Sequence, residues 1–316
     1  MAAQYKYQLS LDPSNRQAPT RDDGSFPESI PAAKETKTHP TRTSGEEDAS
    51  LYFIGTATTL LEWQGVRILT DPNFLHAGDH VHLGPGVTGT RRTNPAINLH
   101  ELPHIDAVLL SHYHADHFDQ KVEASLRRDL PIITTPHAKQ HLHEEKPEPE
   151  KFSQVYDLDF FESAFLTVAE RKKDTAGQIA HSSDATAPSK FKPAIKVTGT
   201  PGKHVPPGGV LEAANDLLQA VPPTNGWMIE LGYKTNSADD SSFQNGYRIY
   251  ISGDTLYVDE LKDIPENYKD KNVDLMLIHL GGTTIPGPKM PLLMVTMDAE
   301  QGIKLMQLIN PDVTIP

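Results

Sequence analysis

The feature that most constrains this chain is a strand-like segment that leads directly into a cluster of histidines and acidic residues. Ile105–Leu110 is a nearly continuous apolar run, which is typical of a strand buried on both faces. It leads into Ser111–Asp119, which contains the pattern His-x-His-x-Asp-His. By composition, this pattern is expected by chance only about 0.002 times in such a chain. The segment therefore indicates a functional site at the end of a buried strand.

The spacing within the motif favours metal binding. If His112 and His114 leave the strand in extended backbone, both imidazoles lie on the same side and can share one cation. Asp116 and His117 lie one turn further along and can reach a second cation. A histidine-rich polar loop without a metal is the alternative interpretation.

The composition restricts the chemistry further. The chain has 15 histidines and no cysteine, so a thiolate zinc site, an iron–sulfur cluster and a cysteine nucleophile are excluded. Any metal must be held by nitrogen and oxygen. The formal net charge of −13 argues against broad binding to nucleic acid. We find no apolar stretch long enough for a transmembrane helix and no secretory signal, and we expect a cytoplasmic protein.

The length of 316 residues suggests one large domain or two ordinary ones. Residues 1–48 are charged and proline-rich, and we expect a disordered or loosely packed N-terminal arm, either loose or laid across the domain. The domain itself is expected over residues 49–316, with surface insertions near 143–151 and 171–193.

Short strands and helices alternate along the domain, and we find no internal repeat at the residue level. Strands are expected at Val66–Thr70, Ile132–Thr135, Ala164–Val168, Ala194–Gly199, Trp227–Tyr233, Tyr247–Ser252 and Val273–Ile278. Helices are expected after Asp119, near His137–Leu142 and from Asp298 to Ile309. This order predicts an α+β layered domain in which sheets face each other and helices cover them.

Two further segments have a suitable side chain where a strand ends. His204 follows a strand and a Pro-Gly turn, and Asp254 follows the strand Tyr247–Ser252. Alone, each is more simply explained as a structural turn residue. Beside the histidine motif, both become candidate metal ligands.

Together these motifs resemble the metallo-β-lactamase-fold hydrolase superfamily. Four further segments are similar to the branch that contains ascorbate-6-phosphate lactonase and N-acyl-phosphatidylethanolamine-hydrolysing phospholipase D: Tyr52–Thr58, Leu69–Pro72, Leu277–Gly282 and Met297–Glu300. The resemblance covers roughly residues 50–316. It implies a four-layered αββα sandwich, a dinuclear metal site at one sheet edge, and hydrolysis by a metal-bound hydroxide.

The resemblance also implies a set of ligands. The first metal would be held by His112, His114 and His204. The second would be held by Asp116 and His117, with Asp254 bridging both metals. Asp116 would also orient the nucleophile. Two divalent ions are expected, with zinc favoured and manganese or iron compatible with the same ligands.

The sequence departs from the family pattern at its end. In this branch the last ligand of the second metal is a histidine that directly follows a strand, whereas this sequence ends at Val313–Pro316. We therefore expect a chain that is truncated at its C-terminus and a second site that binds metal more weakly. His279 is a candidate substitute ligand or proton donor, and a structural role is the alternative.

Weaker signals point to substrate contacts. Arg91 and Arg92 end a glycine-rich loop and are candidates for binding a phosphate or carboxylate, and a solvated loop is the alternative. Tyr257, three residues after Asp254, is a candidate hydrogen-bond donor, although packing at a helix start is the simpler explanation. The pair His80 and His82 and the pair His141 and His143 share the His-x-His spacing, but no acidic partner follows, so we treat them as decoys.

The leading functional hypothesis is a metal-dependent lactonase or phosphodiesterase that acts on a small-molecule substrate. A nuclease of the same fold is one alternative, which the acidic charge disfavours. A non-catalytic scaffold with an incomplete second metal site is the other. The sequence is compatible with oligomer formation but does not predict it.

Overall fold

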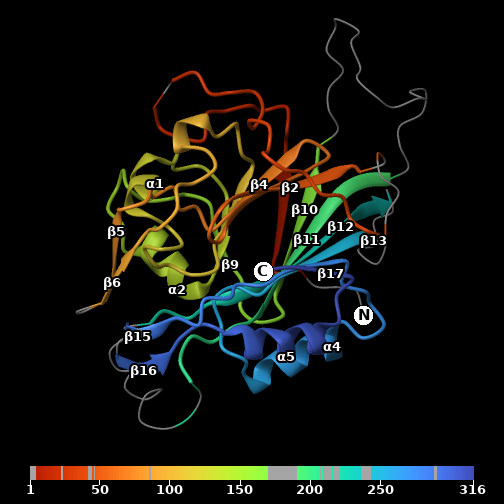
Figure 1. Cartoon of the computed structure of the whole chain (residues 1–316). Helices are drawn as coiled ribbons and strands as arrows, with labels where there is room; N and C mark the ends of the chain where they lie inside the picture. The colour runs from red at the N-terminus through yellow and green to blue at the C-terminus, as the bar shows by residue number, and fades with distance from the viewer. Residues whose placement is uncertain are drawn as a thin grey trace, which may run out of the picture.

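The computed structural model describes residues 5–316 except 23, 42–44, 46, 85–86, 170–190, 207, 209–214, 216–220, 236–242 and 288–289. Within these residues, two large sheets face each other across the centre of the molecule (Figure 1). Along the larger sheet, the strands lie in the order β1 (Tyr7–Leu11), β10 (Ser163–Val168), β11 (Phe191–Pro201), β12 (Asn225–Thr235), β13 (Phe243–Ile251), β14 (Leu275–Leu277) and β17 (Val313–Ile315). Along the smaller sheet, they lie in the order β2 (Ala49–Gly55), β3 (Thr58–Trp63), β4 (Val66–Thr70), β7 (Ala107–Leu109), β8 (Ile132–Thr134) and β9 (Val155–Asp157).

Helices cover the outer face of each sheet. On the smaller sheet these are α1 (Gln120–Ser125), α2 (Pro136–Lys139) and the π-helical turn η2 (Gln140–Glu144). On the larger sheet they are η4 (Asp259–Lys262), α4 (Asp263–Asn267) and α5 (Ala299–Ile309). A further 3-10 turn, η1, spans Leu99–Glu101. None of the described helices is long and apolar enough to cross a membrane.

Two side-chain caps fix where the outer helices begin. Asp119 accepts a hydrogen bond from the backbone N–H of Val122 at the start of α1, and Asp298 accepts one from Gln301 at the start of α5. At its other end, α5 stops at Asn310, which adopts the left-handed conformation that ends many helices. Both helices begin at the residues expected from the sequence.

The alternation of side chains along the strands creates three apolar layers. In β7, Ala107 and Leu109 face the space between the sheets, whereas Val108 and Leu110 pack beneath α1 and α2. In β13, Ile249 faces the same central space, whereas neighbouring Tyr250 packs beneath the helices of the other side. Because successive strand side chains point to opposite faces, each sheet is buried on both sides. The predicted αββα sandwich is therefore confirmed.

The same polar arrangement occurs once in each sheet. Arg67 on β4 donates its backbone N–H to Asp106 at 2.7 Å and its guanidinium to Glu62 at 2.7 Å. In the other half, Arg248 donates its backbone N–H to Asp274 at 2.7 Å and its guanidinium to Glu230 at 2.8 Å. The two halves also pair their strands alike: β4 runs parallel to β7, and β13 runs parallel to β14. The molecule thus contains a structural repeat that the sequence analysis missed.

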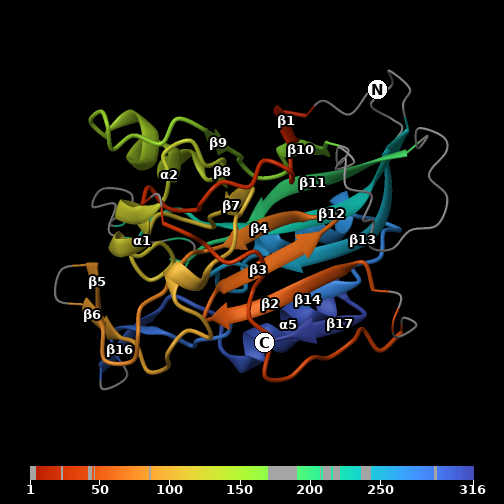
Figure 2. The same ribbon diagram turned by 90° about the horizontal axis from the view of Figure 1, so that it is seen from above.

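The N-terminal segment differs from the loosely packed arm expected for residues 1–48. Tyr7–Leu11 pairs in parallel with β10 and forms the edge of the larger sheet, where Leu9 and Leu11 are buried. The chain then crosses the domain surface, where the backbone N–H of Arg21 donates to Ser125 at 2.7 Å (Figure 2). The boundary of the domain at residue 49 stays a prediction.

The two expected surface insertions have different outcomes. The segment near 143–151 begins inside η2 and is attached to the domain by Glu150, which pairs with Arg21 and, at 2.6 Å, with Arg128. In the segment near 171–193, residues 191–193 belong to β11, and the remainder lies outside the described residues.

Two small antiparallel hairpins lie beside the sandwich (Figure 1). They are β5 (His80–Gly84) with β6 (Val87–Thr90), and β15 (Thr284–Gly287) with β16 (Met290–Met294). His80 lies on the first hairpin and pairs with Thr90 across it, at 3.0 Å.

Candidate metal centre

The candidate ligands gather where the central strands of both sheets end. His112, Asp116 and His117 follow β7, His204 follows β11, and Asp254 follows β13. The two sheets meet here through a hydrogen bond from the backbone N–H of Asn225 to the carbonyl of Ser111, at 3.0 Å. Strand order thus brings together residues that are distant in sequence.

The rings of His112, His117 and His204 are close-packed and buried. The ring of His112 lies 4.3 Å from that of His117 and 4.7 Å from that of His204, measured between centroids. The ring of His114 is 5.8 Å from that of His112. One ligand atom from each of His112, Asp116 and His117 lies within 4.8 Å of the others.

The hydrogen bonds of the buried histidines leave one ring nitrogen of each available. The Nδ1 of His204 lies 3.0 Å from the carbonyl oxygen of Val295, which only accepts, so this nitrogen carries the proton. The Nδ1 of His112 lies 3.0 Å from the Ser111 hydroxyl. The Nε2 atoms of His112 and His204 are buried without a hydrogen-bond partner among the described residues. A metal ion would satisfy both, since ligating histidines usually have their second nitrogen held in this way.

His117 provides a further indication. Its Nδ1 lies 3.0 Å from Asp71 and its Nε2 lies 3.1 Å from Asp254. Because carboxylates only accept, the neutral ring can satisfy only one of them with a hydrogen. Burial lowers the pKa of His117, but Asp254 and Asp71 outweigh this effect and raise the pKa well above its usual value. A cation between His117 and Asp254 would relieve the same conflict.

Electrostatics divide the site into neutral and charged groups. Burial lowers the pKa of His112 and that of His204, which favours the neutral imidazoles that bind metals. Burial raises the pKa of Asp254, but His117 and His279 outweigh it, so the carboxyl remains ionised. For Asp116, burial is likewise outweighed, by His114 and His117.

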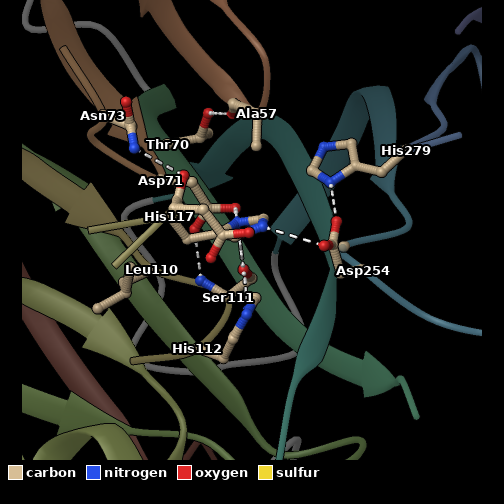
Figure 3. A network of polar contacts seen from close by, with 12 residues as sticks. Ala57, Thr70, Asp71, Asn73, Leu110, Ser111, His112, His117, Asp254 and His279 are labelled. Carbon is tan, nitrogen blue, oxygen red and sulfur yellow. Dashed lines mark hydrogen bonds and ion pairs between the residues drawn. The ribbon is translucent and has the colours of Figure 1, made fainter. Parts of the chain in front are cut away.

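Asp254 lies between two histidines, as Figure 3 shows. One of its oxygens lies 3.1 Å from the Nε2 of His117, and the other lies 3.2 Å from the Nδ1 of His279. The backbone N–H of His279 donates to the Ser252 hydroxyl at 3.0 Å, which fixes the end of β14 against that of β13. His279 is therefore placed at the site by its own strand.

His114 and Asp116 form the more exposed part of the site. The Nδ1 of His114 lies 2.8 Å from the Asp116 carboxylate, and both side chains are partly exposed. The turn that presents them is closed by hydrogen bonds from the backbone N–H groups of His117 and Phe118 to the carbonyl of His114.

Sequence reasoning missed Asp71, which supports the segment Ser111–Asp119 that carries the histidine motif. We call this segment the metal loop. Asp71 accepts from both the backbone N–H and the hydroxyl of Ser111, at 2.7 and 2.9 Å, and also contacts His117. It adopts a left-handed backbone conformation with φ of 34°, which an aspartate tolerates better than most residues. In the sequence, the segment Leu69–Pro72 is only part of the family resemblance, which assigns no role to Asp71.

The candidate substrate residues lie in three different environments. The Nη1 of Arg91 donates to the hydroxyl of Thr56 at 2.7 Å and lies 3.5 Å from Asn73, whose amide donates to the carbonyl of Asp116 at 2.9 Å. Arg91 thus supports the metal loop indirectly. Arg92 is exposed, and Tyr257 packs against the helices of the larger sheet.

Comparison with known proteins identifies the family. A profile described as a beta-lactamase superfamily domain matches residues 66–316. The mitochondrial N-acyl-phosphatidylethanolamine-hydrolyzing phospholipase D of Saccharomyces cerevisiae is 34% identical over 85 residues, which are 27% of this chain and 17% of that protein. The chain likewise spans only 17% of the length of the other curated relatives considered.

Two solved structures share the fold. An isothiocyanate hydrolase from Delia radicum gut bacteria superimposes with a TM-score of 0.55 at 18% identity, over 84% of this chain and 82% of that one. A possible metal-dependent hydrolase from Veillonella parvula gives 0.54 at 16% identity, over the same shares. The chain belongs to the beta-lactamase superfamily domain family.

Proposed function

We propose that this protein is a metal-dependent hydrolase. The observation that carries the proposal is the pair of buried Nε2 atoms, on His112 and His204, that lack partners while the opposite ring nitrogens are anchored. Burying unpaired polar atoms is costly, so the structure favours a ligand between them. The anchoring supports a metal ion, which uses the free nitrogen directly.

We assign the residues to two divalent ions. His112, His114 and His204 would hold the first, and Asp116 and His117 the second, with Asp254 bridging both. When bound, such ions act as Lewis acids and lower the pKa of water, which supplies a nucleophile at neutral pH. Zinc is the favoured ion, because histidine nitrogen and carboxylate oxygen are among its usual ligands in proteins.

The chain's own residues then orient the reaction. Asp116, held by His114, would accept a hydrogen bond from the attacking water and so direct it toward the substrate. His279, whose Nδ1 faces Asp254, would give a proton to the leaving group from its Nε2 in the doubly protonated form of the ring, which the Asp254 carboxylate would stabilise. Asp71 would hold the proton of His117 on Nδ1. The Nε2 of that ring, which faces Asp254, would then be unprotonated and able to bind a metal.

The proposed substrate is a small lactone or phosphoester. The match to a phospholipase D supports a phosphoester, and the sequence resemblance to the lactonase branch supports the related ester chemistry. Arg92 is an exposed cation available to a substrate anion. Arg91 is partly committed to Thr56 and Thr93, so its substrate role is the weaker proposal.

The deciding experiment compares two alanine variants with a matched control. We expect His112→Ala and His204→Ala to lose hydrolysis of small lactones or phosphodiesters, together with bound metal measured by elemental analysis. His100→Ala, which changes an exposed histidine on η1, should retain both. Full turnover in the first two variants would contradict the proposal, whereas partner binding without turnover in the intact protein would favour a scaffold. Cleavage of oligonucleotides but not of small esters would favour a nuclease.

A further inference from the structure

A second pair of histidines lies on the outer layer of the smaller sheet. The Nε2 of His137 and the Nε2 of His141 are 3.2 Å apart, and the two rings are inclined at 67°. The residues are four apart, on α2 and the π-helical turn η2 that continues it, so they share one face. A π-type turn is uncommon and frequently marks a functional site.

The separation of the two nitrogens suits a shared metal ion. Zinc bonds to imidazole nitrogen at about 2.0–2.1 Å, and tetrahedral angles then place two such nitrogens about 3.3 Å apart. The observed separation of 3.2 Å is close to this value. Both side chains are partly exposed, which leaves room for water to complete the coordination.

The surroundings of His141 match those of a metal ligand. Its Nδ1 lies 2.8 Å from the Glu145 carboxylate, which fixes the proton there, so the Nε2 of His141 is the acceptor of the hydrogen bond from the Nε2 of His137, and an ion would replace that shared proton. Gln140 donates to the other oxygen of Glu145 at 2.7 Å and so holds the carboxylate in place. The imidazole also stacks on Tyr113, with centroids 5.2 Å apart and planes inclined at 15°.

His137 is available to a metal at neutral pH. Burial, together with the neighbouring His141, lowers its pKa, and this favours the neutral ring. The opposing effect of Glu145 does not reverse this shift.

We propose that His137 and His141, oriented by Glu145 and Tyr113, form a second transition-metal site outside the catalytic centre. It would take zinc or a similar divalent ion with a preference for imidazole. Tyr113 lies between His112 and His114 in the chain, so an ion on His141 would stiffen the ring stacked beside the metal loop. The site does not depend on the hydrolase function proposed above.

Zinc titration of the full-length protein against a chromophoric chelator tests this site. We expect one additional equivalent of zinc in the intact protein, with an affinity that falls roughly tenfold or more in His137→Ala, His141→Ala and Glu145→Ala. His143→Ala is the matched control, because this histidine lies on the same turn but bonds to the carbonyl of Phe152. It should bind zinc as the intact protein does.

A His112→Ala variant separates the two centres. It should keep the additional equivalent, even if its catalytic centre fails to load. In this background, hydrogen exchange of residues 136–145 should slow when zinc is added, and His141→Ala should abolish the slowing. Unchanged zinc binding in His137→Ala and His141→Ala, or an equal loss in His143→Ala, would overturn the proposal.

Discussion

The Nδ1 of His117 lies 3.0 Å from the carboxylate of Asp71, a residue 46 positions earlier in the chain. The same carboxylate accepts two hydrogen bonds from Ser111, so it holds both ends of the turn that carries the candidate ligands. The geometry of the metal loop therefore depends on a side chain that directly follows the neighbouring strand, β4.

This contact predicts the effect of Asp71→Asn. Asparagine keeps the size and tolerates the left-handed backbone, but its amide donates, so the proton of His117 would move to Nε2. We expect metal affinity to fall by about 10–100-fold, as for other residues that support a ligand. Competition titration with a chelator measures this loss. Asp79→Asn, on an exposed loop, is the control, and an unchanged affinity in Asp71→Asn would contradict the prediction.

The backbone at Gly253 predicts a second substitution that disturbs the candidate metal centre. Its φ is +60°, and an added Cβ would lie 2.5 Å from the carbonyl oxygen of Asn225. We expect Gly253→Ala to displace Asp254 and to lower both activity and thermal stability. Gly24→Ala is the control, because no atom lies within 4 Å of its added Cβ. Equal melting temperatures and activities for the two variants would refute this account.

The buried ion pair of the larger sheet predicts a large effect on stability. Arg248 and Glu230 are almost fully buried, and their side chains lie 2.8 Å apart. Replacing Arg248 by methionine leaves the glutamate with Lys196 alone, and we expect the free energy of unfolding to fall by about 3–5 kcal/mol. Lys304→Met, which breaks an exposed pair on α5, should leave the free energy of unfolding almost unchanged. Denaturant unfolding measures both, and similar values for the two would contradict the prediction.

Asp106 predicts a dependence of stability on pH. Burial raises its pKa from 3.8 to about 6, although the Arg67 backbone opposes this shift. A carboxyl whose pKa is higher in the folded state stabilises the fold below its unfolded pKa, and this stabilisation is lost as pH rises through about 6. Asp106→Asn keeps an acceptor for Arg67. As the pH rises from 4 to 8, the free energy of unfolding of Asp106→Asn relative to that of the intact protein should therefore increase by up to about 3 kcal/mol. A pH-independent difference would show that Asp106 is not the cause.

The parts of the site that sequence analysis predicted are those encoded locally. The caps at Asp119 and Asp298 depend on neighbouring residues, and the structure places both as expected. The spacing from His112 to His117 is equally local, and its metal-binding role stays a prediction. The layered α+β domain followed from the order of short strands and helices, and its four-layered αββα form from the family resemblance. To predict that His204 and Asp254 lie close to the motif required the family resemblance, because it is the order of the strands in the sheets that brings these residues there.

The features that escaped prediction depend on distant pairing. Arg67 is 39 residues from Asp106, whereas Arg248 is 26 residues from Asp274, so a repeat search at fixed spacing does not align the two halves. The pairing of Tyr7–Leu11 with β10 also spans more than 150 residues, and the charged composition around it concealed the two buried leucines.

The most direct test of the metal centre is a crystal structure of the zinc-loaded protein with anomalous scattering measured at the zinc edge. We predict a peak about 2.0–2.1 Å from the Nε2 atoms of His112 and His204, and a second near His117 and Asp254. Absence of any ion at His112 and His204 in a protein that still hydrolyses its substrate would contradict the account.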